Sequence, residues 1–152
     1  MKKIVSSVSV LALLLMCLLV GCGQTEPAKT EPLNAEEGLP GVWADATYTA
    51  DTTLGEGVTA LTLVVSAEGK TITLTINTNQ KTVGAALLEH NLIEGDQDDY
   101  GLYVKKVNGM LADYDVDQTY WAFYENDAYA STGVDSTNIT AGVTYKLERT
   151  AG

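Results

Sequence analysis

The chain has 152 residues, of which nine are Lys or Arg and twenty are Asp or Glu, so its formal net charge is −11. A protein this acidic, without a basic patch, is a poor binder of nucleic acid and is repelled by anionic lipid. Its length predicts one compact domain rather than two.

The first 21 residues have the layout of a secretory signal peptide. Lys2 and Lys3 precede an apolar run that is too short to be a comfortable membrane span. The run ends in Leu-Val-Gly before Cys22, the pattern that a lipoprotein peptidase cleaves, although an ordinary signal peptide is the alternative. We therefore expect Cys22 to carry lipid and to hold the protein at the extracytoplasmic face of a bacterial cell membrane. The mature chain would keep seven basic and twenty acidic residues, a charge of −13.

Residues 22–41 are predicted to form a flexible, disordered linker behind the lipidated cysteine. They are rich in Glu, Pro, Thr and Gly and show neither a helical nor a strand period. The folded domain is therefore expected over residues 42–152. The second cysteine, Cys17, lies in the signal peptide, so we expect neither a disulfide nor a cysteine metal site in the domain.

The first part of the domain predicts a hairpin followed by a helix. Val58–Val65 and Thr71–Asn77 alternate apolar and polar residues on either side of a short turn. The period then changes, because Val83, Ala86, Leu87 and His90 follow helical spacing behind Thr82, a candidate N-cap. The segment before Val58 predicts either one more strand or the cover of a sheet edge.

The second part of the domain predicts a series of strands and loops. The predicted elements are an acidic loop (Glu94–Asp99), a strand (Tyr100–Val107) that ends at the turn Asn108-Gly109, a loop (Ala112–Gln118), an aromatic strand (Tyr120–Tyr124), a short strand (Ala128–Ala130) and a last strand (Val143–Arg149). The order β-β-α-β-β-β predicts an α+β domain of the β-grasp type, in which one mixed sheet packs on one helix.

Two acidic clusters are candidate cation sites. Asp113, Asp115 and Asp117 have the opening spacing of a calcium loop, but Gln118 and Tyr124 stand where that loop needs glycine and glutamate. We interpret this series, and the acidic run Glu94–Asp99, as solvated loops. Calcium binding at the three aspartates is the minor alternative.

No catalytic constellation is found in the sequence. His90 is the only histidine, so no site with two histidines can form, and its place at a helix end favours an interaction with the helix dipole. No glycine-rich phosphate loop follows a strand, and nothing singles out a carboxylate for acid–base chemistry. We predict that the chain is not an enzyme and has no cofactor.

The aromatic strand is the strongest candidate for a binding surface. Alternation places Trp121 and Phe123 on one face and Tyr120, Ala122 and Tyr124 on the other. One set can fill the core while the other forms a flat, partly apolar shelf. Stabilisation of the sheet by cross-strand pairs explains the same pattern equally well.

Several short motifs together resemble a known family. They are TVGAALL at residues 82–88, YVKKVNG at 103–109, Tyr120-Trp121, GVD at 133–135, and Ala141-Gly142. From about Thr71 to Arg149 the chain resembles the DUF4430 domain, which is similar to the C-terminal β-domain of the vitamin B12 carriers transcobalamin and intrinsic factor. The resemblance implies a β-grasp-like, ligand-binding fold.

The resemblance also implies a ligand site and a ligand. The matching positions are Tyr120, Trp121 and Ala122 of the aromatic strand and Thr132, Gly133 and Val134 of the following loop, and the implied ligand is cobalamin or another corrinoid. In the carriers a glutamine stands at the position of Ala122, and a helical domain encloses the other side of the vitamin. A partner protein that completes the site, and a different ligand, both stay open.

The leading hypothesis is a surface-anchored, non-enzymatic lipoprotein that binds a small molecule. Its expected partners are the membrane, through the lipid on Cys22, a small-molecule ligand, and a protein or transporter, but not nucleic acid. The alternative is a cell-surface module that binds a protein or a glycan.

Overall fold

The structure is a computed structural model that describes residues 41–152. The predicted signal peptide, Cys22 and the linker before Gly41 lie outside the described residues. From Gly41 onward the elements are η1, a 3-10 helix (Gly41–Asp45), β1 (Thr52–Leu54), β2 (Thr59–Ala67), β3 (Lys70–Thr78), α1 (Val83–Glu89), β4 (Ile93–Asp98), β5 (Gly101–Val107), β6 (Met110–Leu111), α2 (Tyr114–Asp117), β7 (Thr119–Glu125), β8 (Ala128–Tyr129) and β9 (Thr144–Ala151).

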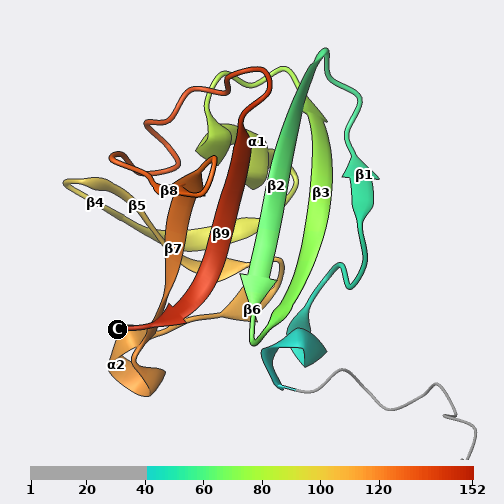
Figure 1. Cartoon of the computed structure of the whole chain (residues 1–152). Coiled ribbons are helices and arrows are strands. Elements are labelled where there is room, and N and C mark those ends of the chain that lie inside the picture. The colour runs from blue at the N-terminus through green and yellow to red at the C-terminus, as the bar shows by residue number, and fades with distance from the viewer. Residues whose placement is uncertain (1–40) are drawn as a thin grey trace, which may run out of the picture. The chain divides into compact units, whose positions relative to one another are not determined.

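Six strands form a mixed sheet in the order β1-β3-β2-β9-β7-β8 (Figure 1). The predicted hairpin is present as β2 and β3, which pair antiparallel around a turn at Glu68 and Gly69. The last strand, β9, lies between β2 and β7, parallel to the first and antiparallel to the second. The predicted α+β fold with a mixed sheet is therefore confirmed.

One face of this sheet is apolar and the other is rich in threonine. The alternation predicted for β2 and β3 is confirmed, because every second side chain is buried and the threonines between them are partly or fully exposed. The buried set is Leu61, Leu63, Val65, Ile72, Leu74 and Ile76.

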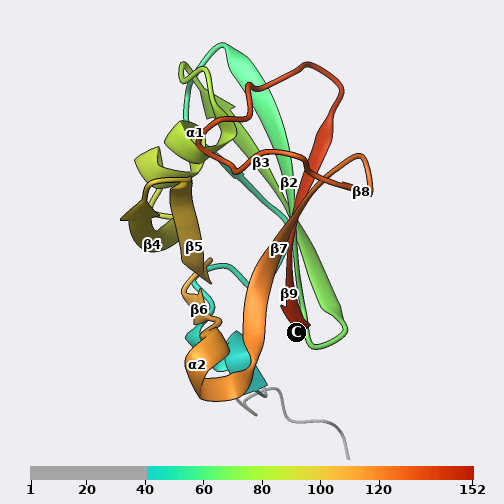
Figure 2. The same cartoon turned by 90° about the vertical axis from the view of Figure 1, so that its left-hand side faces the viewer.

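Helix α1 covers the apolar face, as the edge-on view in Figure 2 shows. Thr82 is its N-cap, and the hydroxyl of Thr82 accepts a hydrogen bond from Ala85 N at 3.3 Å. Val83, Ala86 and Leu87 are buried against the sheet. A helix of seven residues is too short to be stable alone, so this packing provides most of its stability.

Strands β4, β5 and β6 form a second, three-stranded sheet on the same side of the main sheet as α1 (Figure 2). The prediction of one sheet packed on one helix is therefore incomplete, because the covering layer combines a helix and a small sheet. The predicted turn at Asn108-Gly109 is present between β5 and β6, and both residues have a positive φ, 53° and 86°.

The prediction of an acidic loop over Glu94–Asp99 is wrong, because Ile93–Asp98 is a strand that pairs with β5. Two ion pairs across this pairing compensate its negative charges. Lys105 Nζ lies 2.7 Å from Asp96 Oδ2, and Lys106 Nζ lies 2.8 Å from Glu94 Oε2. The hydrogen bond to Asp96 raises the pKa of Lys105 above its ordinary value.

The predicted loop around the three aspartates contains the one-turn helix α2. Asp113 caps this helix, because its Oδ1 accepts a hydrogen bond from Asp115 N at 3.0 Å. Gln118 ends the helix in the left-handed conformation, with φ of 59°. Within residues 41–152 no three acidic, histidine or cysteine side chains are grouped as metal ligands.

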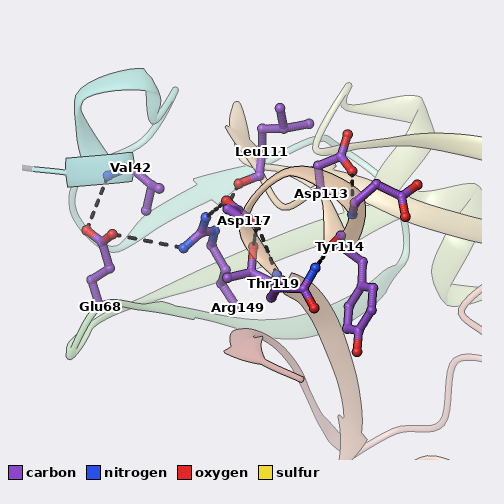
Figure 3. A network of polar contacts seen from close by, with 10 residues as sticks. Val42, Glu68, Leu111, Asp113, Tyr114, Asp117, Thr119 and Arg149 are labelled. Carbon is purple, nitrogen blue, oxygen red and sulfur yellow. Dashed lines mark hydrogen bonds and ion pairs between the residues drawn. The ribbon is translucent and has the colours of Figure 1, made fainter.

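Asp117 pairs with Arg149 of β9 in the network shown in Figure 3. The guanidinium also donates through Nε to Leu111 O at 2.9 Å and lies 4.0 Å from the carboxylate of Glu68. A hydrogen bond from the Thr119 hydroxyl, helped by the charge of Arg149, lowers the pKa of Asp117. Arg149 therefore connects α2 and β6 to the turn of the β2–β3 hairpin.

The segment before β2 adds a strand and also contributes to the core. β1 pairs parallel with β3 at the edge of the main sheet. Trp43 in η1 is buried, its indole N–H donates to Ala67 O at 2.8 Å, and Lys70 Nζ lies 4.5 Å from the centre of its ring. Between Gly41 and Gly152 no helix is long and apolar enough to cross a membrane.

Candidate ligand-binding cleft

A cleft of about 300 Å³ opens between the main sheet and the covering layer, next to β7. Its floor is formed by Trp121 and Phe123 of β7 and by Leu147 of β9. One wall is the start of β5, residues 102–104, and the other is the segment 129–134, which includes the end of β8 and the loop after it.

The structure brings together five of the six residues predicted for the ligand site. Tyr120 and Trp121 reach the cleft from β7, and Thr132, Gly133 and Val134 line it from the loop. Ala122 does not line the cleft and is only 1% exposed. Ala122 faces the side of β7 opposite to Trp121 and Phe123, and its role in ligand binding stays a prediction.

The predicted shelf on the outer face of β7 is used within the protein. The ring of Tyr124 lies edge-on to the ring of Tyr129, with centroids 5.4 Å apart. Lys146 Nζ lies 4.4 Å from the centre of the Tyr124 ring. The concave surface is therefore on the Trp121 side of the strand and not on the Tyr124 side.

Helix α1 holds the loop wall in place through its first turn. Gly84 N donates to Val134 O at 2.7 Å, and Val83 N donates to Thr137 O at 2.9 Å. A Cβ on Gly84 would lie only 2.8 Å from the Cα of Asp135, so the loop can approach the helix this closely because residue 84 is glycine. The contact explains why two of the sequence motifs, at 82–88 and 133–135, belong together.

Asp135 joins the two walls of the cleft. Its Oδ2 accepts a hydrogen bond from Leu102 N, on the β5 wall, at 3.2 Å. Gly101 has φ of 117° and a Cβ there would lie 2.7 Å from Oδ2, so the carboxylate fits against the start of β5 only beside glycine. The other oxygen, Oδ1, is buried and has no hydrogen-bond partner among the described residues.

None of the residues that line the cleft is charged. Its lining combines apolar and aromatic side chains with the hydroxyls of Ser131 and Thr132 and the backbone of Gly133. Because the chain has a net charge of −11, the potential around this uncharged cavity disfavours an anionic ligand. The lining suits a molecule with apolar faces and neutral polar groups.

His90 lies apart from the cleft, at the C-cap of α1. Its Nε2 lies 4.0 Å from the carboxylate of Glu89 and is packed against Gly55, where a Cβ would lie 2.8 Å from it. This position at a helix end is the one that the sequence predicts.

Sequence reasoning missed the residues that form the β5 wall and part of the floor. Leu102, Tyr103, Val104, Phe123 and Tyr129 all line the cleft. Phe123 could have been predicted to line the cleft, because it lies on the same face of the strand as Trp121. No sequence pattern predicts residues 102–104 as part of the cleft, because their position next to β7 depends on how the second sheet packs.

Comparison with solved structures finds several matches. One match is a candidate metal-binding protein from Ruminococcus gnavus ATCC 29149, with 26% sequence identity, a TM-score of 0.58, and coverage of 61% of this chain and 97% of that chain. Another is haptocorrin in complex with Cbi, with 16% identity, a TM-score of 0.45, and coverage of 64% of this chain and 27% of that chain. No curated protein matches the chain.

Residues 80–144 match the family described as Domain of unknown function (DUF4430). The matched range includes α1, the three strands of the second sheet, β7 and the loop after β8, which together form most of the cleft. Residues 80–144 are therefore similar to the DUF4430 domain, the family that the sequence motifs resemble.

Proposed function

We propose that this chain is a non-enzymatic binding protein for a small molecule, held at the extracytoplasmic face of a bacterial membrane by lipid on Cys22. The observation that carries the proposal is the cleft beside β7, where five residues predicted from sequence meet around an uncharged cavity of about 300 Å³. Ligand pockets in proteins have this mostly apolar lining with a few polar groups, although this one is at the small end of their size range.

The first ligand to test is cobalamin or another corrinoid. A corrin ring has broad apolar faces and a fringe of neutral amides. Such a molecule matches a cleft with an aromatic floor, hydroxyls at Ser131 and Thr132, and no charged lining. The ring is larger than the cavity, so its edge would enter the cleft while its face rests on the exposed Tyr103 and Tyr129.

The topology supports a β-grasp-like fold for this binding protein. A hairpin leads into a helix, and the last strand returns to the centre of the sheet, parallel to the first strand of that hairpin. This arrangement leaves β7 near one edge of the sheet, next to the cleft. The Trp121 side of β7 and the loop after β8 therefore both line the cleft.

A bare metal ion as ligand has less support. The Ruminococcus gnavus protein that this chain resembles is described as a candidate metal-binding protein. Within residues 41–152, however, no group of three acidic, histidine or cysteine side chains is arranged to hold a metal. Asp113 and Asp117, two of the three aspartates in the calcium-like series, are used as a helix cap and as the partner of Arg149.

A protein or glycan partner is the second candidate, and exposed tyrosines favour it. Tyr100, at the tip of the β4–β5 hairpin, and Tyr103 and Tyr129, beside the cleft, all expose large parts of their rings. Tyrosine is enriched at interfaces because it combines an apolar ring with a polar tip. Under this function Tyr100, which does not line the cleft, would contribute to binding.

The test is a titration of a soluble form lacking residues 1–22 with cobalamin. Binding is followed by tryptophan fluorescence and by the visible spectrum of the corrin. Tyr129→Ala should weaken binding because Tyr129 lines the cleft, whereas Tyr100→Ala is the matched control and should not. Unchanged spectra at high micromolar cobalamin would remove corrinoids as ligands. Equal losses in the two variants would favour a broader protein or glycan surface.

A further inference from the structure

The two tryptophans of the chain differ in how their indole N–H groups are used. Trp43 is buried and its Nε1 donates to Ala67 O at 2.8 Å. Trp121 is only 7% exposed, and its buried Nε1 has no hydrogen-bond partner among residues 41–152. A buried donor without a partner costs free energy, so Trp121 Nε1 marks a position where an acceptor is missing.

An acceptor without a partner lies behind the walls of the same cleft. Asp135 Oδ1 is buried and unpartnered, while Oδ2 of the same carboxylate accepts from Leu102 N. A Cβ on Gly133 would lie 3.0 Å from Oδ1. Leu102 and Gly133 both line the cleft, so this carboxylate is next to its lining. The site therefore combines an unused donor on its floor with an unused acceptor beside its walls.

We propose that the cleft takes a neutral carboxamide group, and that Trp121 Nε1–H donates to the carbonyl oxygen of that group. An amide is uncharged and has an acceptor oxygen together with an N–H donor, which Asp135 can accept. A carboxylate would match Trp121 but would be repelled by Asp135 and by the net charge of −11. This inference rests on the proposed use of the cleft for binding, but not on a corrinoid as the ligand.

Both unpartnered atoms are covered in the structure, so the cleft has to widen slightly as the amide enters. The hydrogen bond from Leu102 N to Asp135 Oδ2 ties the β5 wall to the loop wall, and it stays in place because the ligand N–H goes to the other oxygen, Oδ1. Each oxygen of Asp135 then accepts one hydrogen bond. The carboxamide thus satisfies both atoms without leaving a buried charge unpaired.

The experiment is a titration of the full chain in mild detergent, followed by the two indole N–H signals in its nitrogen–proton NMR spectrum. The probes are benzamide, benzoate and benzylamine, which share one ring and differ in the charge and polar group that they present. Benzamide should move the Trp121 signal downfield, and the Trp43 signal, whose donor is already used, should stay in place. Benzoate and benzylamine should leave both signals unchanged at the same concentration.

The variant Trp121→Phe keeps an aromatic ring and removes the donor. Benzamide affinity, measured by calorimetry, should fall about fivefold, because the loss of one hydrogen bond costs about 1 kcal/mol of binding free energy. The proposal is overturned if benzamide moves neither signal up to its solubility, if benzoate or benzylamine binds as well, or if Trp121→Phe binds benzamide unchanged.

A parallel titration with cobalamin distinguishes the source of the amide and separates this inference from the proposed function. Cobalamin binding with a shift of the Trp121 signal would assign the amide to the fringe of a corrinoid. A response to benzamide without one to cobalamin would support the amide site and remove the corrinoid. Cobalamin binding that leaves the Trp121 signal in place would preserve the function and overturn the inference.

Discussion

Replacing Tyr145 by phenylalanine removes a single buried hydroxyl that anchors the loop before β9. Tyr145 is fully buried, and its hydroxyl donates to Asn138 O at 3.0 Å and accepts from Thr140 N at 2.9 Å. Its ring stacks on Phe123 with centroids 6.1 Å apart. The change to phenylalanine keeps this stacking and removes the two hydrogen bonds, so the variant isolates the anchoring of the loop.

The size of the effect follows from the two hydrogen bonds. Each contributes a net of about 1 kcal/mol, but Asn138 and Thr140 are exposed residues, so water can replace part of the loss. We expect Tyr145→Phe to lower the free energy of unfolding by about 1–2 kcal/mol. For a domain of this size, that corresponds to a decrease of roughly 3–8 °C in Tm.

The assay is urea unfolding followed by circular dichroism, with Tyr100→Phe as the matched control. Tyr100 is almost fully exposed, so loss of its hydroxyl should change the free energy of unfolding by less than about 0.5 kcal/mol. Equal midpoints for the two variants would refute the anchoring role of Tyr145. Loosening of the same loop should also weaken the proposed ligand binding at the cleft, because Thr132 and Gly133, which line it, lie a few residues before Asn138.

Three further changes test other contacts. Thr82→Ala removes the N-cap of α1 and should cost about 1 kcal/mol in urea unfolding, while Thr82→Ser should cost less because it keeps the acceptor oxygen. The folded-state pKa of Asp117 is lowered from 3.8, chiefly by the Thr119 hydroxyl, so its contribution to stability is present above the unfolded value and is lost as pH falls through the folded one. Asp117→Asn should therefore remove part of the acid sensitivity of unfolding measured between about pH 2 and 5. Asp135→Ala should speed hydrogen exchange at the Leu102 amide, whereas Asp135→Asn should not, because asparagine keeps an acceptor.

The elements that could be predicted from the sequence are those with a local signal. In β3 the alternation of Ile72, Leu74 and Ile76 with threonine is complete within one strand. Thr82 precedes a helical period by one residue, and Asn108-Gly109 is a turn signal in itself. Each of these patterns needs no information from the rest of the chain, and each is present in the structure.

Strand β4 could not be predicted because its pairing depends on another segment. Its residues, IEGDQD, have neither apolar alternation nor a high β propensity. Two lysines on β5 compensate its negative charge. Lys105 pairs with Asp96, and Lys106 pairs with Glu94. A charged edge strand of this kind also resists pairing with other chains, so its composition fits its place at the edge of the second sheet.

The residues of the cleft also divide into those that could be predicted from the sequence and those that could not. Tyr120, Trp121 and the loop at Thr132 were predicted through a resemblance, and they do lie together. Ala122 was assigned to the site through the same resemblance, and it does not line the cleft. The β5 wall could not be predicted at all, because its place beside β7 is decided by how the second sheet packs on the first.

Two kinds of residue build this cleft, and they have different consequences for function. Gly84 and Asp135 fix the positions of backbone segments, since one lets the loop sit on α1 and the other ties that loop to β5. Tyr103, Tyr129 and Thr132 are exposed residues that line the cleft with their side chains. Changes at the first kind would move the walls and alter stability and binding together. Changes at the second kind would alter the ligand while the fold stays the same, so similarity of fold alone does not specify what this cleft binds.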